Sequence, residues 1–390
     1  MSSLVRVLCV SDYYLPGYLG GGPIRTLANM RAALGSAVEL AIFTRDRDLG
    51  ASAPYPDIAV NEWLPTPDGP IRYAAPGEFG ARGLARAARG QDFDLLYLNS
   101  YFGFHSSIAP RLWWRRAWPD KPVLLAPRGE FSPGALAIKA PKKSLFLTLM
   151  RRTGLDRNLW WHASTAAEAE DILRQFPAAR GRVHLAVDPV HIAADANAAP
   201  HPEKTSGQLR IAFISRISPK KNLDGLLDML KAMRQDIELS IYGPLEDRAH
   251  WQGCEARIAA LPDNIRARYC GSLSPEQVSP TFAAHDLFAF PTHGENFGHV
   301  IFESLRAGTP VLLSDQTPWA PTPDGAITVV PLADVAGWRQ QIARAADRNN
   351  AEQQAVRAAA LAFARTHAAN SGTIADNIRM FQAVASARKF

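Results

Sequence analysis

The chain has 390 residues, a length that suits two domains of just under about 200 residues each. It is 47% hydrophobic and 21% charged, which excludes a disordered chain, and its three cysteines (Cys9, Cys254 and Cys270) lack the paired spacing of a disulfide framework or a zinc site. The net charge of +6 favours anionic partners, which include nucleotide phosphates, acidic lipids and nucleic acids.

The N-terminal half alternates short β-branched runs with longer helical patterns, which predicts an α/β fold with a parallel sheet covered by helices. The first apolar run is interrupted by Arg6, so it predicts a strand rather than a signal peptide. No run approaches the roughly 20 apolar residues of a membrane-spanning helix. We expect a helix over residues 24–34 and strands over residues 5–10, 39–43, 94–98 and 122–126.

Three consecutive glycines, Gly20, Gly21 and Gly22, follow the first expected strand. The segment lacks the G-x-G-x-x-G order and the short strand-to-helix turn of a dinucleotide fingerprint. Glycines let backbone approach a ligand closely, and they also form plain flexible turns. Both interpretations stay open for this loop.

Residues 188–208 are rich in Ala, Pro and polar residues, a composition typical of a linker. Further strands are expected at 209–215, 237–243, 287–291, 310–315 and 326–330. We therefore predict doubly wound, Rossmann-like domains over residues 1–190 and 205–370, facing each other across a central cleft. A C-terminal helix over residues 371–390 is expected to pack back on the first domain. Ligands of such sheets bind at the carboxyl ends of the strands.

The segment "GENFGHVIFE" places Glu295 before an expected helix and Glu303 inside it. If the helix begins near Gly298, a rise of about 1.5 Å per residue puts the two carboxylates at most about 12 Å apart. The first helix amides lie between them and form an anion site. This order matches the sugar hydroxyls, the diphosphate and the ribose hydroxyls of a nucleoside diphosphate sugar. Two solvated glutamates at a helix start are the alternative.

Arg216 and Lys221 lie in the loop after the strand at residues 209–215. At the carboxyl end of a strand, two such cations can reach the same diphosphate. The alternative is a pair of solvated loop cations.

Together, this basic pair and the Glu-loop-helix-Glu segment closely resemble family 4 of the retaining glycosyltransferases, which have the GT-B fold. The resemblance implies that Arg216 and Lys221 neutralise the donor diphosphate, and that Glu295 contacts the transferred sugar. These three residues are the implied catalytic set, and Glu303 is implied to bind the ribose. The full donor-binding set that the resemblance implies is Gly21, Gly22, Asn99, Gly243, Gly271, Gly294, Asn296, Phe297, Gly298, His299 and Glu303.

One segment departs from the family pattern. Family members often carry histidines within the segment that is residues 94–107 here, and one of them approaches the donor sugar. This chain has Tyr97 and Asn99 at those places, and His105 follows. We expect His105 to be an ordinary surface or core histidine, while Asn99 can hydrogen-bond a sugar hydroxyl but cannot act as an acid or a base.

The resemblance implies an enzyme that transfers a hexosyl or N-acetylhexosaminyl group with retention. The donor would be a nucleotide sugar, most commonly of uridine diphosphate, and the acceptor a glycan or lipid-linked glycan of bacterial-type polysaccharide or lipopolysaccharide synthesis. No cofactor or metal is expected, because the two cations neutralise the diphosphate. A nucleotide-sugar epimerase of the same fold is the alternative. A nucleic-acid-binding protein is disfavoured, since aromatic and basic residues follow no binding-module pattern.

Two segments of the first domain, residues 111–118 and 139–152, mix Trp, Leu and Phe with Arg and Lys. Interfacial membrane helices have this pattern, and so do ordinary helices with one buried face. The unpaired cysteines predict a cytoplasmic protein, and the membrane interpretation adds binding to the anionic inner face of the cytoplasmic membrane.

Overall fold

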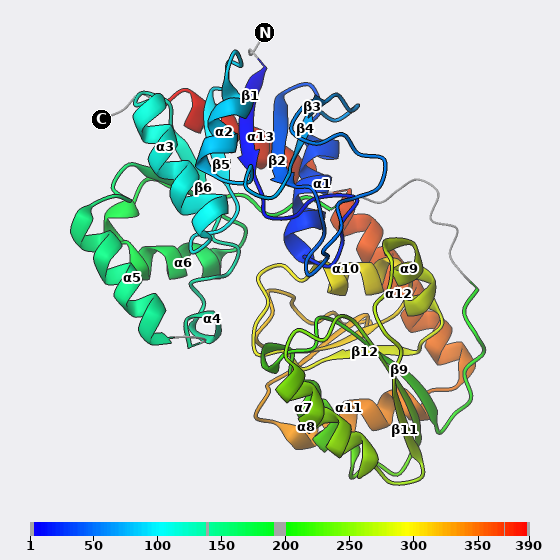
Figure 1. The fold of residues 1–390 in the computed structure, drawn as a ribbon. Coiled ribbons are helices and arrows are strands. Elements are labelled where there is room, and N and C mark those ends of the chain that lie inside the picture. The colour runs from blue at the N-terminus through cyan, green and yellow to red at the C-terminus, as the bar shows by residue number, and fades with distance from the viewer. Residues whose placement is uncertain (1–3, 138–139, 191–199, 370, 388–390) are drawn as a thin grey trace. The chain divides into compact units, whose positions relative to one another are not determined.

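The computed structural model describes residues 4–137, 140–190, 200–369 and 371–387. The chain divides into a first unit, Met1–His191 with Asn370–Phe390, and a second unit, Ile192–Ala369. Residues 191–199, in the middle of the expected linker, lie outside the described residues. Each unit contains one sheet (Figure 1).

The sheet of the first unit has the strand order β3-β4-β2-β1-β5-β6-β7-β8. Neighbouring strands are parallel, apart from the antiparallel pair β3 and β4. The strands β1 and β5 are almost wholly apolar and buried, as a parallel sheet covered on both faces requires. The strands are β1 (Val5–Val10), β2 (Val38–Arg45), β3 (Trp63–Leu64), β4 (Ile71–Ala74), β5 (Leu95–Leu98), β6 (Val123–Leu125), β7 (Leu159–Ala163) and β8 (Val183–Leu185).

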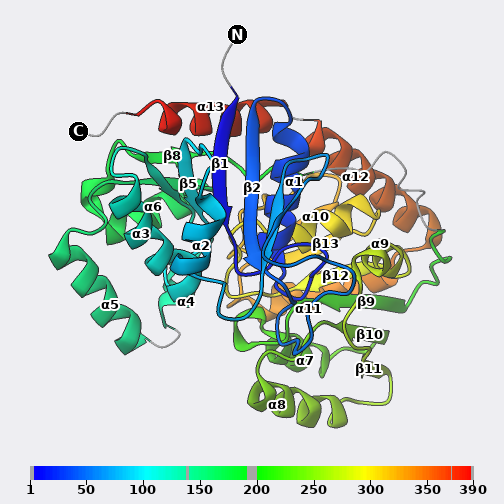
Figure 2. The ribbon, with the colours of Figure 1, turned by 45° about the horizontal axis from the view of Figure 1, so that its top comes forward.

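Two apolar clusters form the core of this unit. One cluster joins the strands to α1 (Gly22–Leu34) and α13 (Ser371–Ala385), so the C-terminal helix packs on the first unit, as Figure 2 shows. The ring of Phe381 on α13 lies edge-on to that of Tyr97, with centroids 5.3 Å apart. The other cluster draws on Trp114, Phe131 and Trp161. The remaining α-helices in the described part of this unit are α2 (Ala81–Ala88), α3 (Ala109–Ala117), α4 (Pro133–Ala137), α5 (Ala140–Thr153) and α6 (Ala166–Gln175).

The sheet of the second unit is parallel throughout, in the order β11-β10-β9-β12-β13-β14. The chain winds from β9 outward to β11 and then returns to the other side of β9 with β12, so the strand order reverses between β9 and β12. This is the position where open α/β sheets bind ligands. Its elements are β9 (Gln208–Ile214), α7 (Leu223–Leu230), β10 (Asp236–Tyr242), α8 (Arg248–Ala259), β11 (Ile265–Tyr269), α9 (Pro275–Ala283), β12 (Leu287–Phe290), α10 (His299–Arg306), β13 (Val311–Ser314), β14 (Ile327–Val330), α11 (Val335–Asp347) and α12 (Asn350–Ala368).

The second unit begins earlier than the predicted start at residue 205. The buried ammonium of Lys204 donates hydrogen bonds to the carbonyls of Thr205 at 2.8 Å and Ala346 at 2.7 Å. His201 Nδ1 lies 2.9 Å from the carbonyl of Ala283. These polar contacts bind residues of the expected linker to the second unit, and linker composition alone does not reveal them.

Candidate functional site

The loops that follow β9 and β12 meet where the strand order of the second sheet reverses. Lys221 in the first loop is ion-paired with Glu295 in the second, and their side chains are only 10% and 14% exposed. The ammonium of Lys221 also lies 5.3 Å from the ring centroid of Phe290, the last residue of β12. The structure thus brings together the predicted cation and the predicted carboxylate in a partly desolvated position, where a charged ligand would be held strongly.

Hydrogen bonds between the two loops fix this pair. The carbonyl of Lys220 accepts a hydrogen bond from His293 N at 2.8 Å and one from Thr292 Oγ1 at 3.1 Å. Asn222 has left-handed backbone at φ 58° and donates its side-chain amide to the carbonyl of Pro291 at 2.8 Å. Asn tolerates this conformation better than most residues, so it can turn the chain into α7 directly after Lys221.

Arg216 lies nearer to solvent than Lys221. Its guanidinium is 2.9 Å from Glu246 in the loop after β10, and the two side chains are 40% and 45% exposed. An exposed pair of this kind contributes little to stability, so an anionic ligand can displace Glu246 at small cost. The sequence interpretation did not include Glu246, because an isolated loop glutamate carries no signal of its own.

Gly243 and Gly271 follow β10 and β11 and are joined by a hydrogen bond from Gly243 N to the carbonyl of Gly271 at 2.9 Å. A Cβ atom on Gly243, at φ 130°, would lie 1.9 Å from the carbonyl oxygen of Ser215. A Cβ atom on Gly271, at φ 82°, would meet open space. Close backbone packing therefore explains why residue 243 is a glycine, whereas the surroundings of Gly271 leave room for a ligand.

Replacing Gly243 by alanine is expected to lower the free energy of unfolding by about 2 kcal/mol or more, because the new methyl group collides with rigid backbone and adds conformational strain. Gly271→Ala is the matched control. It carries the strain of a positive φ without the collision, so it should cost about 1 kcal/mol. Urea denaturation of both variants measures the difference, and equal losses would contradict the packing argument.

The start of α10 lies beside the Lys221–Glu295 pair along the chain. Gly298, at φ 81°, is the N-cap residue, and as a glycine it has no side chain with which to cap the helix. A Cβ atom on Gly298 would lie 2.8 Å from Ile301, so only glycine fits here without displacement. His299 begins the helix, and Glu303 follows one turn later. This end thus combines helix-start amides with the predicted ribose-binding carboxylate.

The other predicted residues of the loop between β12 and α10 differ in how far they are exposed to solvent. Phe297 is buried, its ring packs 5.4 Å from that of Trp319, and its carbonyl accepts a hydrogen bond from Trp319 Nε1 at 2.6 Å. Its side chain is therefore an anchor of the loop, and its backbone is the part available to a ligand. Gly294 and Asn296 lie partly exposed on either side of Glu295. Trp319 was not expected, because its contact depends on how the chain folds after β13.

In the first unit, Asn99 follows β5 and is held by its neighbours. Its side-chain oxygen accepts a hydrogen bond from Arg128 Nη2 at 2.9 Å, and its side-chain nitrogen donates to Cys9 Sγ at 3.3 Å. These contacts fix the amide in one orientation. Asn99 is therefore a structural member of a buried polar cluster, while its predicted contact with the donor stays a prediction.

Arg128 is the centre of this cluster, and its side chain is only 8% exposed. The guanidinium is 2.6 Å from Asp188 and donates a hydrogen bond to the hydroxyl of Tyr97 at 2.7 Å. Burial opposes the charged guanidinium, but Asp188 raises the pKa of Arg128 above its ordinary value. The backbone of Arg128 is left-handed at φ 54°, an uncommon conformation for a non-glycine residue. Such a strained, charged residue at the carboxyl edge of the sheet is typical of functional sites.

His162 on β7 continues the cluster. Its Nε2 lies 2.8 Å from the carbonyl of Ala186, which can only accept, so the proton is assigned to Nε2. Its Nδ1 then accepts the hydroxyl proton of Tyr97 at 2.7 Å. Burial, reinforced by the charge of Arg128, lowers the pKa of His162 to about 4. The imidazole is therefore neutral at pH 7.

This shift predicts a pH dependence of stability. Because the folded pKa lies below the unfolded value of 6.5, the stabilisation is complete above pH 6.5 and is lost as the pH falls toward 4. The expected loss is about 3 kcal/mol. His184, His201, His285 and His367 also have pKa values lowered by burial, so the test compares unfolding free energies of the protein and of His162→Asn across pH 4–7. A shallower slope in the variant is expected, and an identical slope would contradict the assignment.

The remaining predicted residues of the first unit lie at the surface or at a helix start. Gly21 is the N-cap residue of α1 at φ 75°, and Gly22 is the first residue of that helix, followed by a proline. His105 is exposed, with its ring 5.1 Å from that of Phe104, so of the two expected placements, surface or core, it has the surface one. Among the residues that the structure describes, no group of three or more His, Cys, Asp or Glu side chains is placed to hold a metal ion.

Comparison with known proteins finds similarity to glycosyltransferases. Residues 196–322 match the family model described as glycosyl transferases group 1. The D-inositol 3-phosphate glycosyltransferase of Xylanimonas cellulosilytica is 28% identical over 173 residues, which are 38% of this chain and 39% of that protein. The O-antigen chain mannosyltransferase B of Escherichia coli is 32% identical over 111 residues, which are 27% of this chain and 28% of that protein. The alignments thus span well under half the length of these curated relatives.

Among solved structures, that of Alr3699/HepE from Anabaena, in complex with UDP and glucose, has a TM-score of 0.68 and 14% identity. The match covers 98% of this chain and 100% of that chain. At this identity the likeness concerns the fold. The chain therefore has the two-domain GT-B fold, and its residues 196–322 are similar to the glycosyl transferases group 1.

Proposed function

We propose that the protein is a retaining glycosyltransferase that moves a hexosyl or N-acetylhexosaminyl group from a nucleotide sugar to a glycan or lipid-linked acceptor. The observation that carries this proposal is the largely buried Lys221–Glu295 pair beside the start of α10. A nucleoside diphosphate sugar satisfies every group there. Its diphosphate accepts hydrogen bonds from Lys221, Arg216 and the amides at the start of α10. Its sugar hydroxyls donate to Glu295, and its ribose hydroxyls donate to Glu303.

The mechanism follows from the charge that develops on the departing diphosphate. Lys221 turns from Glu295 to the diphosphate when the donor binds, and Arg216 leaves Glu246 for the same group. Fixed positive groups then stabilise the leaving group in the transition state, so the reaction proceeds without a metal ion. Freed from Lys221, Glu295 accepts hydrogen bonds from the donor sugar and orients it.

The donor base is proposed to be uridine. The complex of the Anabaena structure with UDP and glucose supports this choice, while the E. coli relative is named as a mannosyltransferase. A panel of nucleotide sugars in a thermal-shift assay tests the proposal, because a ligand that binds only the folded state raises the melting temperature. Stabilisation by a uridine diphosphate sugar is expected. Stabilisation by none of the panel would refute the donor site, and stabilisation by another base would refute only the choice of uridine.

The acceptor is proposed to be presented at a membrane surface by way of α5. Leu145 and Leu149 lie one turn apart on this helix and are 73% and 56% exposed, with Lys142 and Arg152 on the same element. This combination suits the interface of an anionic bilayer. Among the helices of the described residues, none combines the length and the apolar character that crossing a bilayer requires.

Leu145→Asp is expected to reduce flotation with phosphatidylglycerol vesicles several-fold, because it replaces the most exposed apolar contact of α5 with a like-charged repulsion. Leu49→Asp, at an exposed leucine of a loop outside α5, is the control and should float as the unmodified protein does. If the unmodified protein stays with the unbound fraction at low salt, the membrane proposal is wrong.

A further inference from the structure

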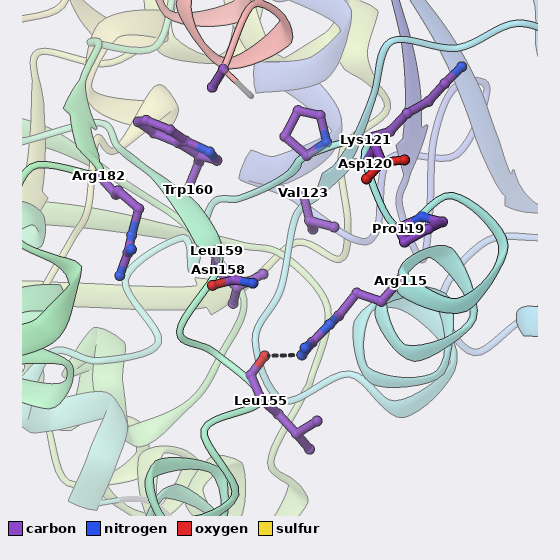
Figure 3. A pocket seen from close by; sticks show the side chains of 12 residues that line it. Arg115, Pro119, Asp120, Lys121, Val123, Leu155, Asn158, Leu159, Trp160 and Arg182 are labelled. Carbon is purple, nitrogen blue, oxygen red and sulfur yellow. Dashed lines mark hydrogen bonds between the residues drawn. The ribbon is translucent and has the colours of Figure 1, made fainter. Parts of the chain in front are cut away.

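A pocket lies in the first unit at the amino ends of β6 and β7, the opposite sheet edge from the one that carries Asn99 (Figure 3). Its volume is about 60 Å³. An apolar cavity of about 150 Å³ is what a single benzene ring requires, so this pocket is too small for a nucleoside. The lining side chains that matter here are Arg115, Lys121, Val123, Asn158, Trp160 and Arg182.

Three cationic side chains reach this pocket from three separate segments. Arg115 belongs to the last turn of α3, Lys121 to the loop before β6, and Arg182 to the residue before β8. Lys121 is paired with Asp92 at 2.7 Å, and Asp120 is the carboxylate that lines the pocket. In Figure 3 the guanidinium groups of Arg115 and Arg182 lie on either side of Asn158.

The two arginines contact neutral partners. Arg115 Nη1 donates to the carbonyl of Leu155 at 2.6 Å, and Arg182 Nη2 donates to that of Ala178 at 2.7 Å. Burial raises the pKa of Asp156 against the opposing charge of Arg111, and Asp156 is already ion-paired with Arg111 at 2.6 Å. Within the described part of the chain, neither Arg115 nor Arg182 has a carboxylate within ion-pair distance.

One donor of Arg182, a residue that lines the pocket, is left without an acceptor in the described part of the chain. Arg182 Nε is buried and has no hydrogen-bond partner in the part of the chain that the structure describes. A buried N–H group without an acceptor is unfavourable, and the more so when it belongs to a charged guanidinium. Arg115 and Arg182 thus line one pocket, and in the described part of the chain no carboxylate neutralises either guanidinium.

We propose that this pocket binds the phosphate group of a phosphate ester. A tetrahedral oxyanion fits the volume, and its oxygens can accept from the fork of each guanidinium, the geometry in which arginine binds phosphate best. The indole of Trp160 forms an apolar wall against which the first carbons of the ester can lie. The proposal does not depend on the function of the second unit, because its residues all belong to the first unit.

Titration with inorganic phosphate tests the proposal in the full-length protein labelled with ¹⁵N-tryptophan. The indole N–H signal of Trp160, assigned with Trp160→Phe, is expected to shift with phosphate and not with chloride at the same ionic strength. Arg182→Met should weaken the affinity at least about tenfold, the effect of losing a charge-assisted hydrogen bond. Arg180→Gln, which removes an exposed cation two residues away, should leave the affinity unchanged.

The outcomes separate this site from the proposed donor site. Lys221→Ala should leave the Trp160 shift intact, so failure of the donor site does not affect the test. Arg182→Lys, which retains the charge and lacks the guanidinium fork, guards against misfolding and should bind phosphate with intermediate affinity. No shift with phosphate, or the same shift in Arg182→Met as in the unmodified protein, overturns the proposal.

Phosphatidylglycerol vesicles identify the source of the phosphate. If the ester is a phospholipid headgroup, Arg182→Met floats less than Arg180→Gln, and inorganic phosphate competes with the vesicles. If the ester is a soluble metabolite, both variants float equally while inorganic phosphate still shifts Trp160. Either result supports a phosphate site, and the NMR titration decides whether that site exists.

Discussion

Lys221→Ala is expected to lower kcat/KM for sugar transfer by about 10²- to 10³-fold, the usual effect of removing one fixed donor to a charge that develops in the transition state. Lys221 is the nearly buried cation of the site, so water replaces it poorly. Initial rates with the best-binding nucleotide sugar provide the measurement. Lys231→Met, at an exposed lysine after α7, is the control and should retain full activity.

Arg216→Ala should cost less than Lys221→Ala, about tenfold, because Arg216 is 40% exposed and acts through solvent-screened charge. Which of the two variants loses more kcat/KM tests the positions of Lys221 and Arg216 better than the size of either loss. If Lys221→Ala retains full kcat/KM, the assignment of the diphosphate position is wrong. If Arg216→Ala costs more than Lys221→Ala, the guanidinium must move farther into the site than its pairing with Glu246 indicates.

Arg128→Met is expected to lower the free energy of unfolding by about 3 to 5 kcal/mol, because it leaves the buried carboxylate of Asp188 without its cation. The hydroxyl of Tyr97 and the side-chain oxygen of Asn99 lose a donor as well. Chemical denaturation followed by circular dichroism measures the loss.

The double variant Arg128→Met with Asp188→Asn removes both charges and should recover part of that stability, since an uncompensated charge is the main cost. A loss below about 1 kcal/mol in the single variant would show that Asp188 is reached by water or finds another cation. A double variant no more stable than Arg128→Met would show that hydrogen bonds, and not charge, dominate the cluster.

The sequence predicts the long buried strands well and the short ones poorly. The expected strand over residues 5–10 coincides with β1, and the strand expected over residues 209–215 differs from β9 by one residue at each end. The two residues of β3 and the three of β8 carry no periodicity of their own. Such short strands form because the neighbouring strand offers free backbone groups, which is a tertiary effect.

The sequence also predicts residues whose contacts form within one loop or between the ends of two adjacent strands. Lys221 and Glu295 are 74 positions apart, yet both follow strands that are neighbours in a parallel sheet. Glu246 and Asn222 complete the site through loop geometry that no motif encodes. Arg128 was missed for a different reason, because its partners Tyr97, Asn99 and Asp188 come from three distant segments. The cleft expected between the two domains stays a prediction.

Hydrogen–deuterium exchange with and without the best-binding nucleotide sugar tests the central claim most directly, because it reports which backbone amides the ligand protects. Protection is expected in peptides that contain residues 215–222 and 293–303, where the loops after β9 and β12 and the start of α10 lie. Lys221→Ala should reduce this protection at the same ligand concentration. Ligand binding that protects other segments, and leaves these two unchanged, would contradict a donor site at Lys221 and Glu295.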